Sequence, residues 1–75
     1  MSLDLLRRDY EATINELAAA LGLDYEELVG FCGSIENGCH GIRRLKEFFT
    51  APEITDLLDR LVDLSNQYRK KVLPT

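Results

Sequence analysis

The chain has 75 residues, a formal net charge of −4 and two cysteines, which together describe one small acidic domain. A domain of this size buries only about 60% of the surface of its unfolded chain, so its core is marginal. One disulfide is the most that its cysteines allow, and no apolar run reaches the ~18 residues of a transmembrane helix. Charges interrupt the apolar residues at the N-terminus, which is not the pattern of a signal peptide, so we expect a cytoplasmic protein.

The first predicted helix spans residues 3–21. Ser2 precedes it in the position of an N-cap. Apolar residues recur at steps of three and four, which is the spacing of one helical face. The members of this face are Leu3, Leu6, Tyr10, Ile14 (or Thr13), Leu17 and Leu21. Gly22 follows as the left-handed residue that ends many helices, and Leu23 as the apolar residue that packs back onto the last turn.

The second predicted helix spans residues 24–36. Asp24 occupies the N-cap position and Glu27 follows three residues later, which is the spacing of a capping box. The predicted inward stripe consists of Leu28, Phe31, Cys32 and Ile35.

Two glycines lie beside that stripe, at Gly30 and Gly33. Each costs up to about 1 kcal/mol relative to alanine inside a helix. Two interpretations are open. Either another backbone packs closely against the glycines, or the helix ends after Phe31 and residues 32–41 form a long loop that could serve as a contact surface.

Asn37 and Gly38 break the chain before a third predicted helix at residues 41–50, with Ile42, Leu45, Phe48 and Phe49 facing inward. Thr50 is the predicted cap of a fourth helix at residues 51–72, which has Pro52 and Glu53 in its first turn. Its apolar face consists of Ile54, Leu57, Leu58, Leu61, Leu64, Tyr68 and Val72. Because almost no strand-like alternation occurs, we predict an all-α, small four-helix bundle in a single domain, residues 1–75.

The middle of the chain holds the residue types of a helix-turn-helix. The matching positions are Thr13, Leu17, Ala18, Leu21, Gly22, Leu23, Leu28 and Phe31. A small residue such as Ala18 lets two helices approach closely, and Gly22 allows the tight turn between them. On these positions residues 13–31 resemble the phage repressor and Cro family. The resemblance implies a helix-turn-helix-like middle to the bundle and, in that family, binding to DNA.

The second helix departs from the family in its charge. Its exposed first turn reads Asp24, Tyr25, Glu26, Glu27, whereas recognition helices present hydrogen-bond donors to bases and phosphates. Carboxylates that face a duplex add repulsion to an interface that must release counterions. In addition, residues 3–21 run without the loop that separates the first two helices of the family. We therefore expect a protein partner in place of DNA.

The charge of the chain is divided unevenly. Residues 1–36 carry a net charge of −6 and residues 37–75 a net charge of +2. The acids could be no more than solvated helix faces, or they could form a surface that meets a basic partner. The second interpretation predicts a small non-enzymatic regulatory or inhibitory protein, phage or bacterial by analogy, that docks on a larger protein with a basic surface. The predicted contact residues are Asp24, Tyr25 (the aromatic anchor), Glu26, Glu27 and Glu36.

Two other functions are compatible with the sequence. The alternative function is a dimeric helix-turn-helix DNA-binding transcriptional regulator that contacts phosphate through Arg43, Arg44 and Lys46. The chain could also be a structural subunit that forms a homodimer along its last helix.

Both cysteines, the only histidine and four of the five glycines fall within residues 30–41. A zinc site there would use Cys32, Cys39, His40 and Glu36, but structural zinc most often takes cysteine pairs two residues apart. We therefore interpret Cys32 as a core residue and place Cys39 and His40 in a loop. A Cys–His nucleophile also needs a third group to orient it, and the sequence offers none. We expect no metal, no cofactor and no enzymatic activity.

Overall fold

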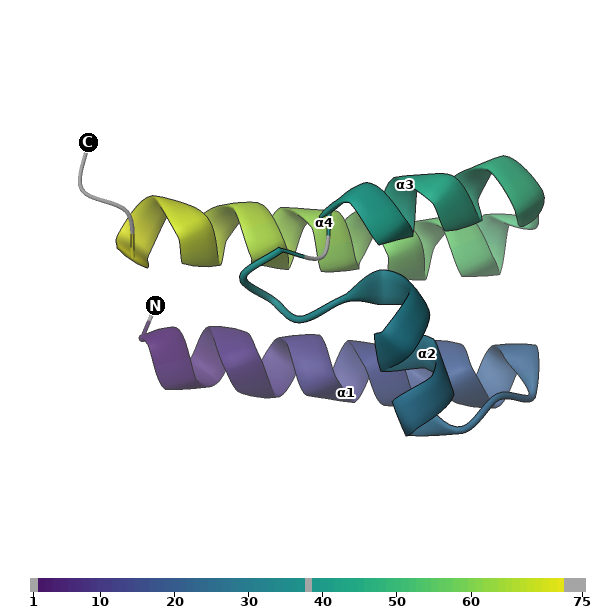
Figure 1. Ribbon diagram of the computed structural model, residues 1–75, viewed down its shortest axis with the longest axis horizontal. Helices are drawn as coiled ribbons and strands as arrows, with labels where there is room; N and C mark the ends of the chain where they lie inside the picture. The colour runs from purple at the N-terminus through teal and green to yellow at the C-terminus, as the bar shows by residue number, and fades with distance from the viewer. Residues whose placement is uncertain (1, 38, 73–75) are drawn as a thin grey trace.

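The computed structural model describes residues 2–37 and 39–72 (Figure 1). Over these residues the fold is all-α, with four helices and no strand in a bundle that measures 36 × 20 × 20 Å. The helices are α1 (Leu3–Leu21), α2 (Tyr25–Cys32), α3 (Cys39–Phe48) and α4 (Pro52–Val72). The prediction of an all-α four-helix bundle is confirmed. None of the described helices combines the length and the apolar content that a membrane crossing requires.

The long helices α1 and α4 run antiparallel, and the two short helices lie across and beside them (Figure 1). α1 packs against α4 and α2, while α3 packs against the same two helices from the opposite corner. Each helix therefore has two neighbours, and the four enclose one core. The short helices α2 and α3 carry the exposed acids and the exposed phenylalanines that are described below.

The core is built from the predicted apolar faces of α1 and α4, closed by single residues from the shorter segments. Its buried apolar residues are Leu6, Tyr10, Ile14, Leu17, Ala18, Leu28, Cys32, Ile35, Ile42, Ile54, Leu58, Leu61, Leu64 and Tyr68. The buried polar side chains among the described residues are Thr13 and Ser65. Thr13 donates to the carbonyl of Asp9 at 2.7 Å and Ser65 to the carbonyl of Ile35 at 2.6 Å, so neither hydroxyl lacks a hydrogen bond.

Both predicted ends of the first helix are present in the structure. The Ser2 hydroxyl accepts a hydrogen bond from the backbone N–H of Leu5 at 3.2 Å, as an N-cap does. Gly22 has a left-handed φ of 73°, and the N–H of Leu23 donates to the carbonyl of Ala18 at 2.9 Å. This closing bond is that of a glycine-based helix end. The order helix, glycine turn, helix is therefore observed.

The prediction that the second helix continues to residue 36 is wrong. α2 ends at Cys32 because Gly33 adopts a φ of 83° and a ψ of 174°, a region that essentially only glycine occupies. The N–H of Gly33 still donates to the carbonyl of Val29, after which an Asn37-to-Ser34 backbone bond closes a turn. A loop does follow α2, which has only eight residues, but it is shorter than the predicted 32–41, because Cys32 ends α2 and Cys39 already begins α3.

The other predicted helix boundaries also shift. The third helix begins at Cys39 and ends at Phe48, two residues earlier at each end than the predicted 41–50. The fourth begins at Pro52, so Ala51 precedes it where Thr50 was expected. Asp24 occupies the N-cap position of α2, but its side chain makes no capping hydrogen bond, so the predicted capping box at this helix is wrong. Exposed carboxylates at a helix N-terminus are instead favoured by the helix dipole.

The loop after α2 is fixed to the bundle by its own backbone carbonyls. Tyr10 donates its hydroxyl to the carbonyl of Gly33 at 2.8 Å, and Ser65 holds the carbonyl of Ile35. Ile35 is only 2% exposed, so it contributes to the core from a turn. The loop is therefore hydrogen-bonded to α1 through Tyr10 and to α4 through Ser65. These two bonds position the start of α3.

Candidate protein-binding surface

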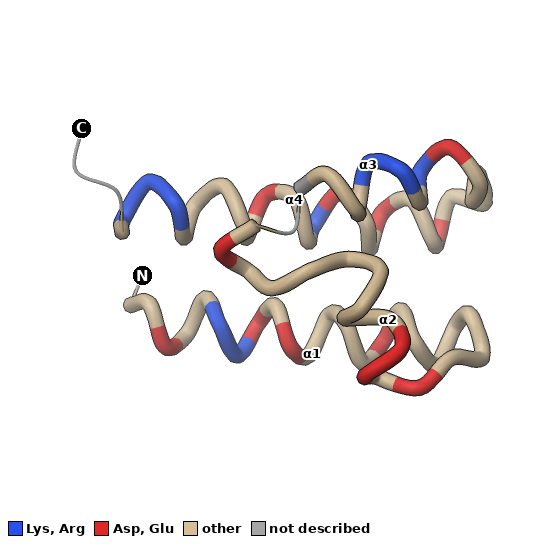
Figure 2. Tube along the Cα trace, viewed as in Figure 1, with Lys and Arg blue, Asp and Glu red and all other residues tan. Residues whose placement is uncertain are grey.

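The first predicted contact surface is the first turn of α2, where it crosses α1 (Figure 2). Asp24, Glu26 and Glu27 are exposed there, and Tyr25 is 36% exposed. Partial burial raises the pKa of Tyr25, and the charge of Glu11 on α1 raises it further. We call Glu11, Asp24, Tyr25, Glu26 and Glu27 the acidic turn.

The carboxylates of the acidic turn are not neutralised within the chain. No hydrogen bond or ion pair joins any of these four side chains to another residue in the described ranges. Acids elsewhere are engaged: Asp59 is paired with Lys46, and Asp63 accepts from Gln67 at 2.8 Å. The acidic turn is therefore a concentrated negative surface.

Helical geometry distributes the α2 residues around the helix. Leu28 points into the core, and Tyr25 and Phe31 lie on opposite flanks of it, at steps of three residues. Glu27 lies one turn before Phe31 and on the same flank. Tyr25 therefore faces α1, whereas Glu27 faces the side on which α3 lies.

Glu36 does not belong to the acidic turn. Its carboxylate accepts from the Arg7 guanidinium at 2.7 Å, and Arg7 also donates to the Tyr68 hydroxyl at 2.8 Å. Hydrogen bonds from Ser34 and then from Arg7 lower the pKa of Glu36 to about 2. The structure therefore separates Glu36 from the other four predicted contact residues, and its interactions tie the loop to α1 and α4.

Replacing Glu36 with glutamine should remove a stabilising interaction that depends on pH. The folded pKa lies below the unfolded value, so the contribution is complete above an ordinary glutamate pKa of about 4.3 and is lost as the pH falls toward about 2. Both side chains of the pair are 46% exposed, so solvent screening limits the effect to about 1 kcal/mol or less. Urea unfolding of both proteins should show this difference at pH 7 and lose it in strong acid. An equal difference at both pH values would contradict the assignment.

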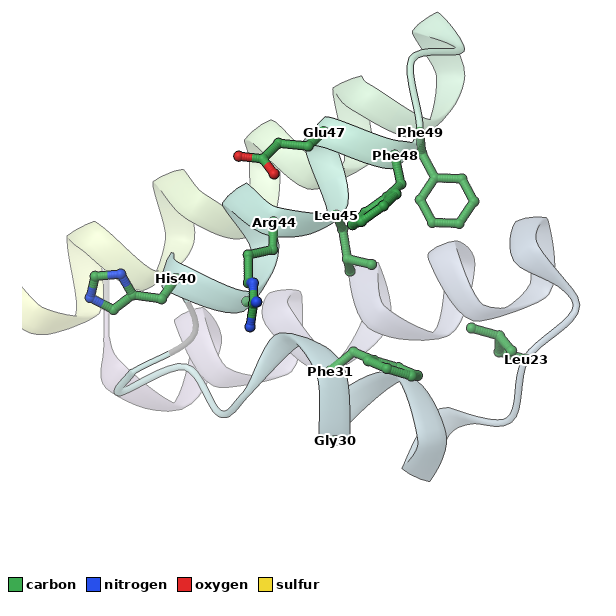
Figure 3. A pocket seen from close by; sticks show the side chains of 10 residues that line it. Leu23, Gly30, Phe31, His40, Arg44, Leu45, Glu47, Phe48 and Phe49 are labelled. Carbon is green, nitrogen blue, oxygen red and sulfur yellow. The ribbon is translucent and has the colours of Figure 1, made fainter.

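A groove of ≈ 830 Å³ opens between α2 and α3 (Figure 3). It is lined by Leu23, Gly30, Phe31, His40, Gly41, Arg44, Leu45, Glu47, Phe48 and Phe49. Phe31 is 62% exposed and Phe48 is 77% exposed. The predictions that both rings face inward are wrong, because the core positions of these turns are taken by Leu28 and Cys32 on α2 and by Ile42 on α3. The rings lie instead over the groove, on its two walls.

Gly41 explains why α3 starts where it does. A Cβ built on Gly41 would lie 2.0 Å from the carbonyl oxygen of Phe31 and 3.1 Å from that of Cys32. The start of α3 is therefore pressed against the backbone at the end of α2, and α2 slopes away from α3 toward Asp24 (Figure 1). At Gly30, in contrast, nothing lies within 4 Å of the same position, so no part of the described chain packs there.

The three bases of the alternative DNA-binding function do not form one surface. Lys46 is paired with Asp59 on α4, which neutralises its charge. Arg43 and Arg44 are exposed on α3, and Arg44 lines the groove. Two of the three predicted phosphate contacts therefore remain available.

The cysteine-rich segment gathers no metal-binding cluster among the described residues. Cys32 is 1% exposed, and burial raises the pKa of its thiol to about 11, so it is held in its protonated form. Glu36, which a zinc site would need, is bonded to Arg7. Cys39 begins α3, so its backbone is helical and not in a loop as predicted, and its side chain lies outside the described part of the structure.

No protein-family model, no curated protein and no solved structure matches this chain. The resemblance of residues 13–31 to the repressor and Cro family therefore stays a prediction.

Proposed function

We propose that this chain is a small non-enzymatic regulatory or inhibitory protein of the cytoplasm that binds a larger protein through the acidic turn. One observation carries the proposal: the first turn of α2 exposes Asp24, Glu26 and Glu27 together with a partly exposed tyrosine, and none of these carboxylates is paired with another described residue. Like charges held together repel one another and attract a basic surface. The acidic turn is thus suited to a partner that supplies lysine or arginine.

Tyr25 would be the anchor of this contact. A tyrosine offers a large apolar ring and a hydroxyl at little cost in side-chain entropy, and such residues often dominate interfaces. Glu11, Asp24 and Glu26 would steer the basic partner and fix its orientation, which raises the association rate more than the affinity. The partner's surface could be one that otherwise binds nucleic acid, in which case occlusion inhibits it.

Reversing one charge in the acidic turn should weaken this binding. We expect Glu26→Lys to lower capture of a basic partner from bacterial lysate by at least about tenfold, because a lysine there repels the basic surface. Glu53→Lys is the matched control: Glu53 follows Pro52 on α4 as Glu26 follows Tyr25 on α2, and both are exposed acids in a first turn. Equal capture by the two variants would reject the proposal.

The salt dependence of the captured complex gives a second measurement. Exposed charges separated by more than about 8 Å are largely screened at physiological salt, so an electrostatic complex should dissociate as salt is added. A gel shift with random-sequence duplex at low salt tests the DNA-binding alternative. A duplex shift at micromolar protein that is lost in Arg43→Ala/Arg44→Ala would replace the proposed function with that alternative.

A further inference from the structure

The groove between α2 and α3 exposes two aromatic rings that the core does not need. Phe31 and Phe48 project from opposite walls, above a floor that includes Leu45 and Phe49 (Figure 3). Soluble monomers rarely expose adjoining large apolar side chains unless the patch is an interaction site. The groove is therefore an uncovered interface.

A charged residue precedes each of the two exposed rings by one helical turn, and the two charges have opposite signs. On α3, Arg44 lies one turn before Phe48, and on α2, Glu27 lies one turn before Phe31. Both charged residues are exposed, and neither is bonded to another residue in the described part of the chain. Each helix thus repeats one arrangement, a charge followed by a ring, with the sign of the charge reversed. Arg44 lines the groove together with Glu47, whereas Glu27 lies on the flank of Phe31, outside the lining.

That arrangement is complementary to itself. In a symmetric dimer the same patch is used by both copies, so each residue must meet a different residue that also belongs to the patch. In such a dimer, Arg44 on α3 of one copy can meet Glu27 on α2 of the other copy. The exposed phenylalanine rings of the two copies then pack against each other. A foreign helix would need to carry both charges in the right places, whereas a second copy carries them already.

We propose that a second copy of this chain covers the groove, with the rings of Phe31 and Phe48 packed between the copies. Arg44 of each copy pairs with Glu27 of the other. Burial of two aromatic rings per copy also supplements the marginal core of a 75-residue chain, and association is one of the usual ways in which such small domains gain stability. The proposal shares Glu27 with the acidic turn but does not use Asp24, Tyr25 or Glu26, so its failure and that of the proposed function can be distinguished.

Sedimentation equilibrium over a wide range of protein concentration tests the dimer. We expect a mass of twice the 8.5 kDa of one chain at high concentration, and the mass of one chain for Phe48→Ser. Leu5→Ser is the control, because Leu5 is an exposed apolar residue, 49% exposed, that does not line the groove. Phe48 lies outside the core, so circular dichroism should show that the variant remains folded. A chain that is monomeric at every concentration overturns the proposal.

Charge exchange tests the pairing itself. Glu27→Arg and Arg44→Glu should each raise the dimer dissociation constant by at least about tenfold, because each places like charges together. An equimolar mixture of the two variants should recover the dimer as a heterodimer, since both sites then join opposite charges, one in the native order and one reversed. Failure of the mixture to associate overturns the pairing. Glu26→Lys should leave the dimer intact, so loss of partner capture and loss of dimer are separate results.

Discussion

Replacing Gly41 with alanine should lower the free energy of unfolding by about 3 kcal/mol or more. The added Cβ would lie 2.0 Å from the carbonyl oxygen of Phe31, and no side-chain rotation can relieve a contact between two backbones. Overpacking in a tight site typically costs about 1–3 kcal/mol, and this contact is closer than a real Cβ tolerates. Either α3 moves away from the end of α2 or the loop between them rearranges. Urea unfolding followed by circular dichroism measures the loss.

The same substitution at Gly30 is the matched control. Gly30 also lies within a helix, but nothing is within 4 Å of its missing Cβ. Alanine there should raise the free energy of unfolding by up to about 1 kcal/mol, because it restricts the unfolded chain and favours helix. If Gly41→Ala is no less stable than Gly30→Ala, α3 does not approach the backbone of α2 as described.

Replacing Ser65 with alanine should destabilise the protein by about 1–3 kcal/mol, although it removes a single oxygen. Ser65 is fully buried on α4 and donates to the carbonyl of Ile35 at 2.6 Å. Without the hydroxyl, that carbonyl loses a hydrogen bond in a place where water cannot replace it. The loop after α2 should then open more easily, which faster hydrogen exchange at residues 35–37 would reveal.

Thr55→Ala is the control for this loss. Thr55 also donates its hydroxyl to a backbone carbonyl, that of Pro52 at 3.1 Å, but this bond is exposed. Water can take the place of the lost hydroxyl, so the free energy of unfolding should change by no more than about 0.5 kcal/mol. Similar losses in the two variants would show that the Ser65 bond does not hold the loop.

The existence of the four helices and both ends of α1 were predictable because they depend on local chemistry. Ser2 and Gly22 mark the ends of α1 by their own hydrogen-bonding and backbone preferences. The end of α2 was not predictable from apolar spacing, because Ile35 continues the three- and four-residue steps of Leu28 and Cys32. A buried residue in a turn and one on a helical stripe produce the same pattern, and only the backbone of Gly33 distinguishes them.

The groove was not predictable because tertiary packing decides which apolar residues face inward. Phe48 ends α3 and is 77% exposed, whereas Phe49, just beyond the helix, packs partly against the core. The sequence did not show the close approach at Gly41 either. The exposure of Asp24, Glu26 and Glu27 was predicted correctly, whereas Glu11 was not among the predicted contact residues. The pairing of Glu36 with Arg7 joins residues far apart in sequence, and spacing alone does not reveal it.

The antiparallel pairing of α1 and α4 has a practical consequence for handling the protein. The helices have nearly equal lengths, 19 and 21 residues, so Leu3 and Val72 lie at the same end of the bundle (Figure 1). The first turn of α2 follows the other end of α1 along the chain and lies away from the two termini (Figure 1). A dye, an affinity tag or a surface linker attached to either terminus therefore leaves both binding surfaces open. A molecule tethered in this way presents its acidic turn outward, in the orientation that a capture experiment requires.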